Sequence, residues 1–356
     1  GFDEPWSIYK AEELFKNVAD KNHPMETVLT IIQGKGTLPR EQAGRNIHYD
    51  DASLANYKKV EQGDFIIHLR SFEGGLEMAN EDGIVSPAYT ILRCKKPHSS
   101  LFYEAYFHTD EFINHILSKS VEGIRDGRQI SYEAFKWLGL PYCDVSEQER
   151  IAQLFCTLSH RIQKQQQMVD ALKKYKRGLI KLVFEKVMSE AHYQLPLSDL
   201  CISISSGRTT VNESNGRYPL FGSTGIVGMT NTIEHDGDIV MVARVGANAG
   251  KVNFFSGRCG VTDNTLVIRV KENTIHPKFL AYFLENFDLH KLIFGSGQPL
   301  VTGGQLKKIQ SPVIAYKAQL LITRSLESLD RIIGTQDTYM EKLIQLKSGL
   351  MQRLFI

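Results

Sequence analysis

The chain contains an internal repeat, and this duplication constrains its fold more than any other feature of the sequence. At a constant offset of 171 residues, segment 130–184 aligns with segment 301–355, and 12 of the 55 positions are identical. Upstream, the run Gly63–Arg70 corresponds more loosely to Gly237–Arg244, and Gly83 corresponds to Gly260. Shared helix composition would not reproduce both blocks in the same order. The sequence therefore predicts two copies of one structural unit.

Each copy is predicted to hold a globular part followed by a long helix. The length of 356 residues suits two domains of ordinary size with such additions. In segments 60–95 and 237–270, short β-branched and aromatic runs are separated by Gly, Asn and Asp, a pattern typical of strands and turns. Segments 102–117 and 278–294 carry apolar residues at helical spacing. We expect an α+β fold with globular parts at 1–145 and 189–316 and long helices at 146–188 and 317–356.

The two long helices are the clearest prediction. Ser146 stands three residues before Glu149, a capping-box pattern that predicts the start of the first helix; no such box marks the second. Steps of three and four then define an apolar seam in each helix, as in a heptad repeat. In the first helix the seam is Ile151, Leu154, Leu158, Arg161, Gln165, Met168, Leu172, Tyr175, Leu179 and Leu182; in the second it is Ile322, Leu329, Ile332, Gln336, Tyr339, Leu343, Leu346 and Leu350.

Helices of this length are too long to pack wholly on one small domain, because about 35 residues span roughly 50 Å. They would most simply pair with each other. The residues that we expect to form this pairing occupy matched positions in the two copies: Leu158, Gln165, Leu172 and Leu179 with Leu329, Gln336, Leu343 and Leu350. Seven basic residues between Lys164 and Lys186 form either a solvated face or a surface that contacts phosphates or a partner.

Composition excludes several classes of protein. Lys and Arg number 42 against 40 Asp and Glu, so the net charge of +2 neither announces nor forbids nucleic-acid binding. The five cysteines are scattered without a C-x-x-C pair, which argues against a zinc ribbon or a disulfide framework and favours reduced thiols in a cytoplasm. The segment that begins at Gly1 does not resemble a signal peptide, and no apolar run approaches the roughly 18 residues of a membrane span.

No recognisable catalytic motif occurs in the sequence. The run Gly246–Lys251 is one residue shorter than a P-loop and is followed by Val252. No dinucleotide-binding, nucleophile-elbow or zinc-protease motif is present, and the histidines do not stand at metal-ligand spacing. We therefore expect a binding protein without a metal site. The alternative is a DNA-modifying or DNA-cleaving enzyme with unrecognised catalytic residues.

Polar side chains gather beside glycines in both copies, a composition that favours DNA recognition loops. Arg and Lys can contact guanine edges, Asn and Gln can contact adenine, and Ser and Thr can hold phosphates. The same residues also form ordinary solvated turns. Arg70 and Arg244 occupy matched positions, each six residues after the Asp of a Gly-Asp turn. The candidates are Lys35, Arg40, Arg45, Arg70, Ser71, Arg128, Gln129, Ser206, Arg208, Ser223, Thr224, Arg244, Asn248, Lys251, Asn264 and Gln298.

Local motifs resemble those of the specificity (S) subunits of type I restriction–modification systems. The run Gln129–Pro141, followed by Glu147–Ala152, is similar to that family's passage from a target recognition domain into a conserved helix. The run Tyr218–Gly228, with Gly237–Val240 and Thr262–Thr265, is similar to one common class of target recognition domain. The order of globular parts and helices extends the resemblance over essentially the whole chain.

The resemblance implies a non-catalytic reader of double-stranded DNA. Two target recognition domains would each read one half of a bipartite target from the major groove. The helices would pair as an antiparallel coiled coil with pseudo-two-fold symmetry and would set the spacing between the halves. Two methyltransferase (M) subunits would dock on the chain, and restriction/translocase (R) subunits would complete the complex. S-adenosylmethionine, ATP and Mg are then expected only on partner subunits, and no cofactor on this chain.

Overall fold

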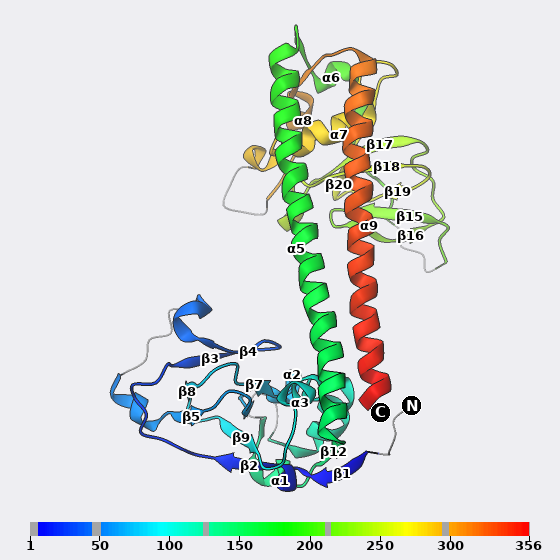
Figure 1. Ribbon diagram of the computed structural model, residues 1–356. Helices are drawn as coiled ribbons and strands as arrows, with labels where there is room; N and C mark the ends of the chain where they lie inside the picture. The colour runs from blue at the N-terminus through cyan, green and yellow to red at the C-terminus, as the bar shows by residue number, and fades with distance from the viewer. Residues whose placement is uncertain (1–5, 45–50, 124–127, 211–214, 294–298, 356) are drawn as a thin grey trace. The chain divides into compact units, whose positions relative to one another are not determined.

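The computed structural model describes residues 6–44, 51–123, 128–210, 215–293 and 299–355 (Figure 1). The chain forms two compact units, each described by itself below. Unit 1 comprises residues 1–166 and 339–356, and unit 2 comprises residues 167–338. Each unit thus combines one globular part with a portion of both long helices. The four segments predicted from the sequence follow chain order instead, and their boundaries stay a prediction.

Both long helices begin at matched positions, 171 residues apart. Helix α5 spans Val145–Glu190, and helix α9 spans Tyr316–Phe355. The predicted cap at Ser146 is wrong, because the backbone N–H of Ser146 donates to Asp144 Oδ2 at 2.9 Å and the helix begins one residue earlier. The hydrogen bonds from Ser146 hold the pKa of Asp144 below its ordinary value. Asp144 is therefore the residue that caps α5.

The helix portions run antiparallel within each unit. In unit 1, Phe155 stacks on Phe355 with ring centroids 5.9 Å apart, and Lys347 Nζ donates to Ser159 Oγ at 2.8 Å. As residue numbers rise along α5, those of the contacting residues fall along α9. Unit 2 shows the same order through ion pairs of Lys173 with Asp337 and Lys176 with Asp330.

The predicted helix seam is half right. The matched residues Leu158, Gln165, Leu172 and Leu179, with Leu329, Gln336, Leu343 and Leu350, are buried or half-buried as expected. The second predicted row is wrong, since all of its members are exposed: Leu154, Arg161, Met168, Tyr175 and Leu182, with Ile332, Tyr339 and Leu346. The row that is buried or half-buried instead stands one residue later: Phe155, Ile162, Val169, Lys176 and Val183, with Leu326, Ile333, Met340, Lys347 and Leu354.

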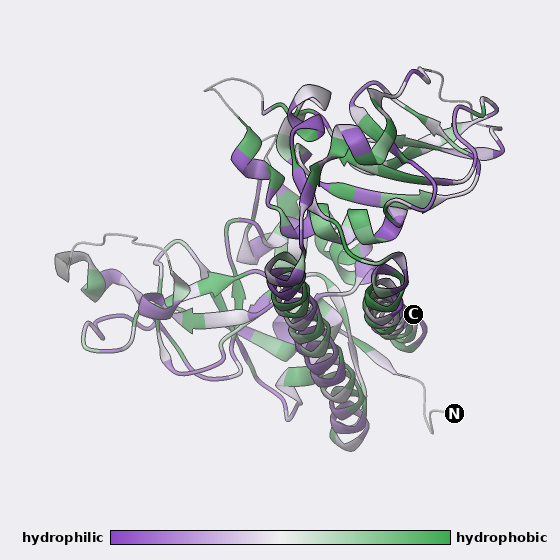
Figure 2. Cartoon of the chain, turned by 90° about the horizontal axis from the view of Figure 1, so that it is seen from above, coloured by the Kyte–Doolittle hydropathy of each residue, from purple (hydrophilic) through white to green (hydrophobic). Residues whose placement is uncertain are grey.

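The error has a simple geometric cause. In an α-helix, residues three and four positions away both lie near the same face, so an apolar residue at either position fits a seam. Hydropathy changes around both helices, and hydrophobic residues occur on more than one side (Figure 2). Lys176 and Lys347 also stand in the buried row, where a search for apolar residues would not place them.

The globular part of unit 1 is built on an antiparallel sheet in the order β2-β9-β6-β7 (Figure 1). Helix α3 contributes Tyr103 and Phe107 to a core with Phe15 and Phe65 of the sheet. The strands are β1 Ser7–Lys10, β2 Phe15–Val18, β3 Leu29–Ile32, β4 Gly36–Pro39, β5 Lys58–Val60, β6 Phe65–Ile67, β7 Glu77–Met78, β8 Gly83–Val85, β9 Thr90–Cys94, β10 Val121–Glu122, β11 Gln129–Ile130 and β12 Gly139–Tyr142. The helices are α1 Ala11–Leu14, α2 Ser71–Gly74, α3 Ser100–Phe107 and α4 Tyr132–Phe135. Segments Arg40–Ala43, Asp51–Asn56 and Leu117–Ser120 form 3₁₀ turns, and Glu111–Ile116 forms a π-helical turn.

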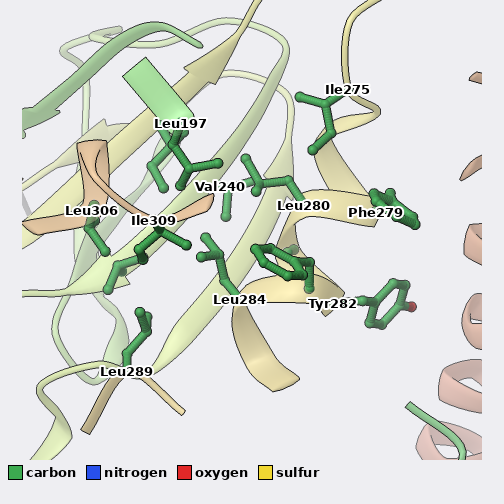
Figure 3. Packing of buried hydrophobic residues seen from close by; sticks show 14 of the residues in the cluster. Leu197, Val240, Ile275, Phe279, Leu280, Tyr282, Leu284, Leu289, Leu306 and Ile309 are labelled. Atoms are coloured by element: carbon green, nitrogen blue, oxygen red, sulfur yellow. The ribbon is translucent and has the colours of Figure 1, made fainter. Parts of the chain in front are cut away.

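Unit 2 repeats this architecture with the sheet order β14-β20-β17-β18. The core beneath the sheet includes Val240, Leu280 and Leu284 (Figure 3). The strands are β13 Gln194–Pro196, β14 Cys201–Ser206, β15 Tyr218–Gly222, β16 Gly225–Thr230, β17 Asp238–Ala243, β18 Val252–Ser256, β19 Gly260–Val261, β20 Thr265–Val270 and β21 Gln310–Pro312. The helices are α6 Leu197–Leu200, α7 Pro277–Asn286 and α8 Gly303–Lys307, with 3₁₀ turns at Gly246–Asn248 and Leu289–Leu292.

Strand pairing matches between the units. Strand β1 pairs with β12 as β13 pairs with β21, and in each four-stranded sheet the last strand along the chain lies between the first and second strands. The predicted α+β class, with two tandem units and two long helices, is confirmed. Within the described residues, no helix combines the length and apolarity needed to cross a membrane.

Matched glutamines fasten each long helix to the globular part that precedes it. Gln148 is buried; its side-chain oxygen accepts from the backbone N–H of Ser99, and its amide donates to Cys143 O. Gln319 is equally buried and accepts from the backbone N–H of His276. Ser99 and His276 are the residues that precede α3 and α7, so both copies use the same fastening.

Matched phenylalanines anchor the far end of each helix in the other copy. Phe184 of α5 enters the core of unit 2, with ring centroids 5.2 Å from Phe279. Phe355 of α9 enters the core of unit 1, 5.3 Å from Phe102. Each globular core therefore contains a residue from the helix that follows the other globular part.

Substitution of a seam leucine and of a leucine outside the seam on α9 tests which row of the helix is buried. Leu343 is 6% exposed and Leu346 is 50% exposed. Because a carboxylate at Leu343 would be buried without a partner, Leu343→Glu should lower the free energy of unfolding by about 3 kcal/mol or more. Leu346→Glu is the control and should change it by no more than about 0.5 kcal/mol. Equal urea-unfolding midpoints for the two variants would contradict the assignment of the seam.

Candidate nucleic-acid interface

Six predicted recognition residues of unit 2 gather at one end of its four-stranded sheet. Antiparallel pairing brings the last residues of β14 and β17 beside the first residues of β18 and β20. The intervening loops are joined by backbone hydrogen bonds from Gly207 to Thr265 at 3.0 Å and from Arg244 to Asn264 at 2.9 Å. This loop end carries Ser206, Arg208, Arg244, Asn248, Lys251 and Asn264.

Ser223 and Thr224 belong to the same region. They form the turn between β15 and β16, and the backbone N–H of Thr262 donates to Phe221 O at 2.8 Å. Strand β15 also runs parallel to β19, which leads directly into the loop that carries Asn264. The structure thus joins eight candidates that lie far apart in the sequence.

Arg244 has a fixed backbone and an available side chain. Its N–H donates to Asn264 O and its carbonyl accepts from Val301 N–H, both at 2.9 Å. In the part of the chain that the structure describes, its guanidinium has no hydrogen bond or ion pair. Arg70 differs, because its guanidinium pairs with Glu73 at 2.7 Å and it lies three residues beyond β6. The matched arginines are therefore not equivalent in their surroundings.

A carboxylate holds the loop that carries Arg208. The Glu234 carboxylate accepts from the backbone N–H groups of Arg208 and Thr209, at 2.9 and 3.1 Å, and from the Thr209 hydroxyl at 2.6 Å. Burial raises the pKa of Glu234, but the hydrogen bonds from Thr209, Arg208 and Val261, together with the nearby His235, outweigh it and lower the pKa below its ordinary value. Glu234 thus stays ionised and orders the loop, while the Arg208 side chain is exposed.

Fewer of the predicted recognition residues of unit 1 lie together. Lys35 is exposed in the turn between β3 and β4, and Gly74 of α2 packs against Gln33 of the same turn. Arg128 lies over the ring of Phe72, with its guanidinium carbon 4.3 Å from the centroid, and Gln129 follows in β11. Lys35, Arg70, Arg128 and Gln129 therefore surround α2.

Two other predicted residues of unit 1, Ser71 and Arg40, do not join this group. Ser71 is fully buried, and its hydroxyl accepts from His68 N–H at 2.9 Å, so it is structural. Arg40 follows β4 at the opposite end of the hairpin from Lys35 and lies 5.9 Å from the ring of Tyr57. Arg45 and Gln298 lie outside the described residues.

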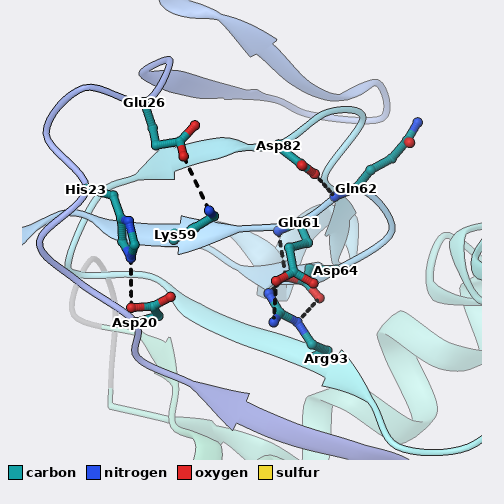
Figure 4. A network of polar contacts seen from close by, with 9 residues as sticks. All are labelled: Asp20, His23, Glu26, Lys59, Glu61, Gln62, Asp64, Asp82 and Arg93. Atoms are coloured by element: carbon teal, nitrogen blue, oxygen red, sulfur yellow. Dashed lines mark hydrogen bonds and ion pairs between the residues drawn. The ribbon is translucent and has the colours of Figure 1, made fainter.

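An ion-pair network fixes the other end of the unit 1 sheet (Figure 4). Arg93 of β9 donates through Nε and Nη2 to both oxygens of Asp64, at 2.9 and 2.7 Å, and through Nη1 to Glu61 at 2.8 Å. Asp64 is 4% exposed and directly precedes β6. The pKa of Arg93 is raised by its hydrogen bond with Asp64. The loop end of the unit 1 sheet, beyond the opposite end of β6, carries Arg70.

Sequence analysis missed the two acidic residues that order the loops, Glu77 and Glu234. Glu77 stands in β7 between apolar residues and is fully buried. An isolated acid in an apolar strand was the only available signal. The cysteines form no disulfide, and no group of three or more His, Cys, Asp or Glu among the described residues could hold a metal ion.

The chain is similar to known specificity subunits. A family model described as the type I restriction modification DNA specificity domain matches residues 194–343. The EcoprrI type I restriction enzyme specificity subunit of Escherichia coli is 28% identical over 123 residues, which make up 35% of this chain. The aligned segment spans only 30% of the length of that relative.

Solved structures extend the likeness to the whole fold. The S subunit of a type I restriction–modification system from M. genitalium covers 100% of this chain and 97% of its own, with a TM-score of 0.66 and 13% identity. The HsdS subunit from Thermoanaerobacter tengcongensis covers 99% of this chain and 98% of its own, with a TM-score of 0.52 and 14% identity. The resemblance inferred from the sequence is confirmed, and the fold is that of these S subunits.

Proposed function

We propose that this chain, whose residues 194–343 match the type I restriction modification DNA specificity domain, is the sequence-reading subunit of a type I restriction–modification complex. The observation that carries the proposal is the loop end of each sheet. There, antiparallel strands collect cationic and amide side chains from separate segments, above a backbone that is already hydrogen-bonded. Each unit would read one half of a bipartite DNA target.

The residues at the loop ends suit duplex DNA. Arg208, Lys251 and Lys35 are exposed cations that can neutralise phosphates, and Asn264 is an exposed amide that can contact adenine. Arg244 adds a guanidinium that can bind a guanine edge with two hydrogen bonds. Rigid loops lose little conformational entropy on binding, which favours selective recognition.

The long helices would set the spacing between the half-sites and dock two M subunits. The docking of M subunits is supported by the row of exposed side chains on each helix, which the sequence pattern had placed in the seam. These apolar side chains recur in both helices, among them Met168, Tyr175 and Leu182 on α5, and Ile332, Tyr339 and Leu346 on α9. Matched rows offer matched docking surfaces, as two copies of one partner would need.

The chemistry of the complex would belong to the partners. M subunits would bring S-adenosylmethionine and methyl transfer, and R subunits would bring ATP, Mg and cleavage. The chain itself would act without catalysis or cofactor, bound to DNA in the cytoplasm. Methyl transfer or cleavage by the purified chain alone would favour the alternative, a DNA-modifying or DNA-cleaving enzyme.

Replacement of Arg244 tests the reading surface. If its guanidinium contacts a base, Arg244→Ala should cost about 1–3 kcal/mol of binding and relax selectivity at one position of the second half-site. The matched control is Arg258→Ala, because Arg258 is exposed and pairs with Asp236 away from the loop end. Selection of bound duplexes from a random pool measures both. Unchanged affinity and selectivity for Arg244→Ala would remove it from the DNA surface.

A charge introduced into the exposed row of α5 tests whether an M subunit docks on that row. Leu182 is 65% exposed, so Leu182→Glu should leave unfolding unchanged while weakening co-purification with the M subunit at least tenfold. Lys181→Glu is the control, since it places a carboxylate on the neighbouring exposed residue and changes the net charge by two units rather than one; it should have little effect. An equal loss of binding for both variants would indicate a general charge effect, and no loss for Leu182→Glu would exclude this row from the docking surface.

A further inference from the structure

A buried carboxylate lies beneath the Lys35 turn (residues Gln33–Gly36). Glu77 of β7 is 0% exposed, and its two oxygens accept from the backbone N–H groups of Gly34 at 2.6 Å and Gly36 at 2.8 Å. Lys35 stands between these two glycines. One side chain from a neighbouring strand thus binds the turn on both sides of its cationic residue.

The rest of the turn is equally constrained. The backbone N–H of Lys35 donates to Ile32 O at 2.9 Å, and its carbonyl accepts from Asn80 Nδ2 at 2.8 Å. Gly34 and Gly36 have φ angles of +73° and +75°, a conformation that other residues rarely adopt. Within the described chain, the Lys35 ammonium itself is exposed and has no hydrogen bond or ion pair. A rigid backbone therefore presents a cation that the fold does not use.

His108 supports the carboxylate from the other side. Its Nε2 lies 3.3 Å from Glu77 Oε1, and its Nδ1 lies 2.8 Å from the carbonyl of Glu104. Since both neighbours are acceptors, the imidazolium form satisfies both. Burial is the largest single influence and would raise the pKa of Glu77 and lower that of His108. The hydrogen bonds and charges around each group together outweigh it, so the pKa of Glu77 is lowered and that of His108 is raised. Both shifts favour the charged forms of the pair.

We infer that Glu77 and His108 are positioning residues that hold Lys35 against a DNA phosphate at the first half-site. The inference rests on the proposed function and assigns part of the DNA-binding surface of unit 1. A lysine is a point charge that suits a phosphate, and the exposed Gly34 beside it lets the backbone approach the duplex closely. A fixed turn also avoids the entropy cost of ordering the contact on binding.

Unit 2 contains a comparable arrangement at a different place. Glu234 holds the backbone of Arg208, whose side chain is exposed, with the same type of carboxylate-to-backbone hydrogen bonds. Glu77 lies in β7, whereas Glu234 precedes β17, so the two acids are not repeat equivalents. Both units thus order a cation-bearing loop through a carboxylate.

The test is a cycle of variants in the full chain: Lys35→Ala, Glu77→Gln and the double variant. Affinity is measured at several salt concentrations on duplexes enriched by the wild-type chain. Loss of one phosphate contact should reduce the slope of log affinity against log salt by about one. Glu77→Gln should reproduce most of this change, and the double variant should be no worse than Lys35→Ala, because Glu77 acts through Lys35.

Three further variants test whether Glu77 and His108 have a merely structural role. His108→Leu should weaken binding in the same direction, and His108→Gln, which keeps a donor toward Glu77, should restore it. Asp64→Asn breaks the ion pair at the opposite end of the same sheet; it should lower thermal stability and leave the salt slope unchanged. This comparison keeps the test decisive even if Glu77→Gln is unstable.

The outcomes separate the inference from the proposed function. Additive effects of Lys35→Ala and Glu77→Gln, or an unchanged slope for Lys35→Ala, would overturn the positioning role while wild-type binding stands. Altered selectivity at one base of the first half-site, with an unchanged slope, would show a base contact and overturn the phosphate contact. No selective binding by the wild-type chain would overturn both.

Discussion

The exchange of helix ends between the two copies is the interaction on which the rest of the structure depends. Phe355, near the end of the chain, packs among Trp6, Phe102 and Phe155 in unit 1. Phe184, its repeat equivalent, packs on Phe279 and Phe283 in unit 2. Neither core is complete without the helix that follows the other globular part. Removal of the last turn of α9 would therefore damage the core built by the first third of the chain.

Much of this architecture was predictable because it is encoded locally and twice. Identical residues at one offset indicated the duplication, and Gln148 and Gln319, which matched in sequence, proved to make the same fastening. The orientation of the seam was not predictable to the residue. Leu154 and Phe155 fit a helical stripe equally well, and only tertiary contacts decide that Phe155 is buried. The polar members Lys176 and Lys347 depend on partners from other elements, which spacing along one helix does not reveal.

The candidate interface was predictable as a set and not residue by residue. Composition located the loops, and the sheet order explains why loops far apart in sequence meet at one end. Composition did not distinguish Ser71, whose hydroxyl is used inside the fold, from Lys35, whose ammonium is available. Nor did it identify Glu77, because an acid becomes a loop anchor only when a distant turn folds over it. Burial and pairing are tertiary properties, so the composition of the loops could not show which of their side chains are buried or paired.

The duplicated framework and the unequal loops together explain how one fold could read two different half-sites. The sheets keep the same strand order, so each unit presents its loop end through the same backbone geometry. The charged groups at those ends differ. In unit 1, Glu77 holds the Lys35 turn, and in unit 2, Glu234 holds the loop of Arg208. Arg244 has an available guanidinium, whereas its repeat counterpart Arg70 pairs with Glu73. Because the anchoring acids are not repeat equivalents, each loop end could change its cations and their anchor without disturbing the sheet or the helix seam. Selection on the loops and selection on the framework can then act on separate residues, as the proposed reading of two independent half-sites would require.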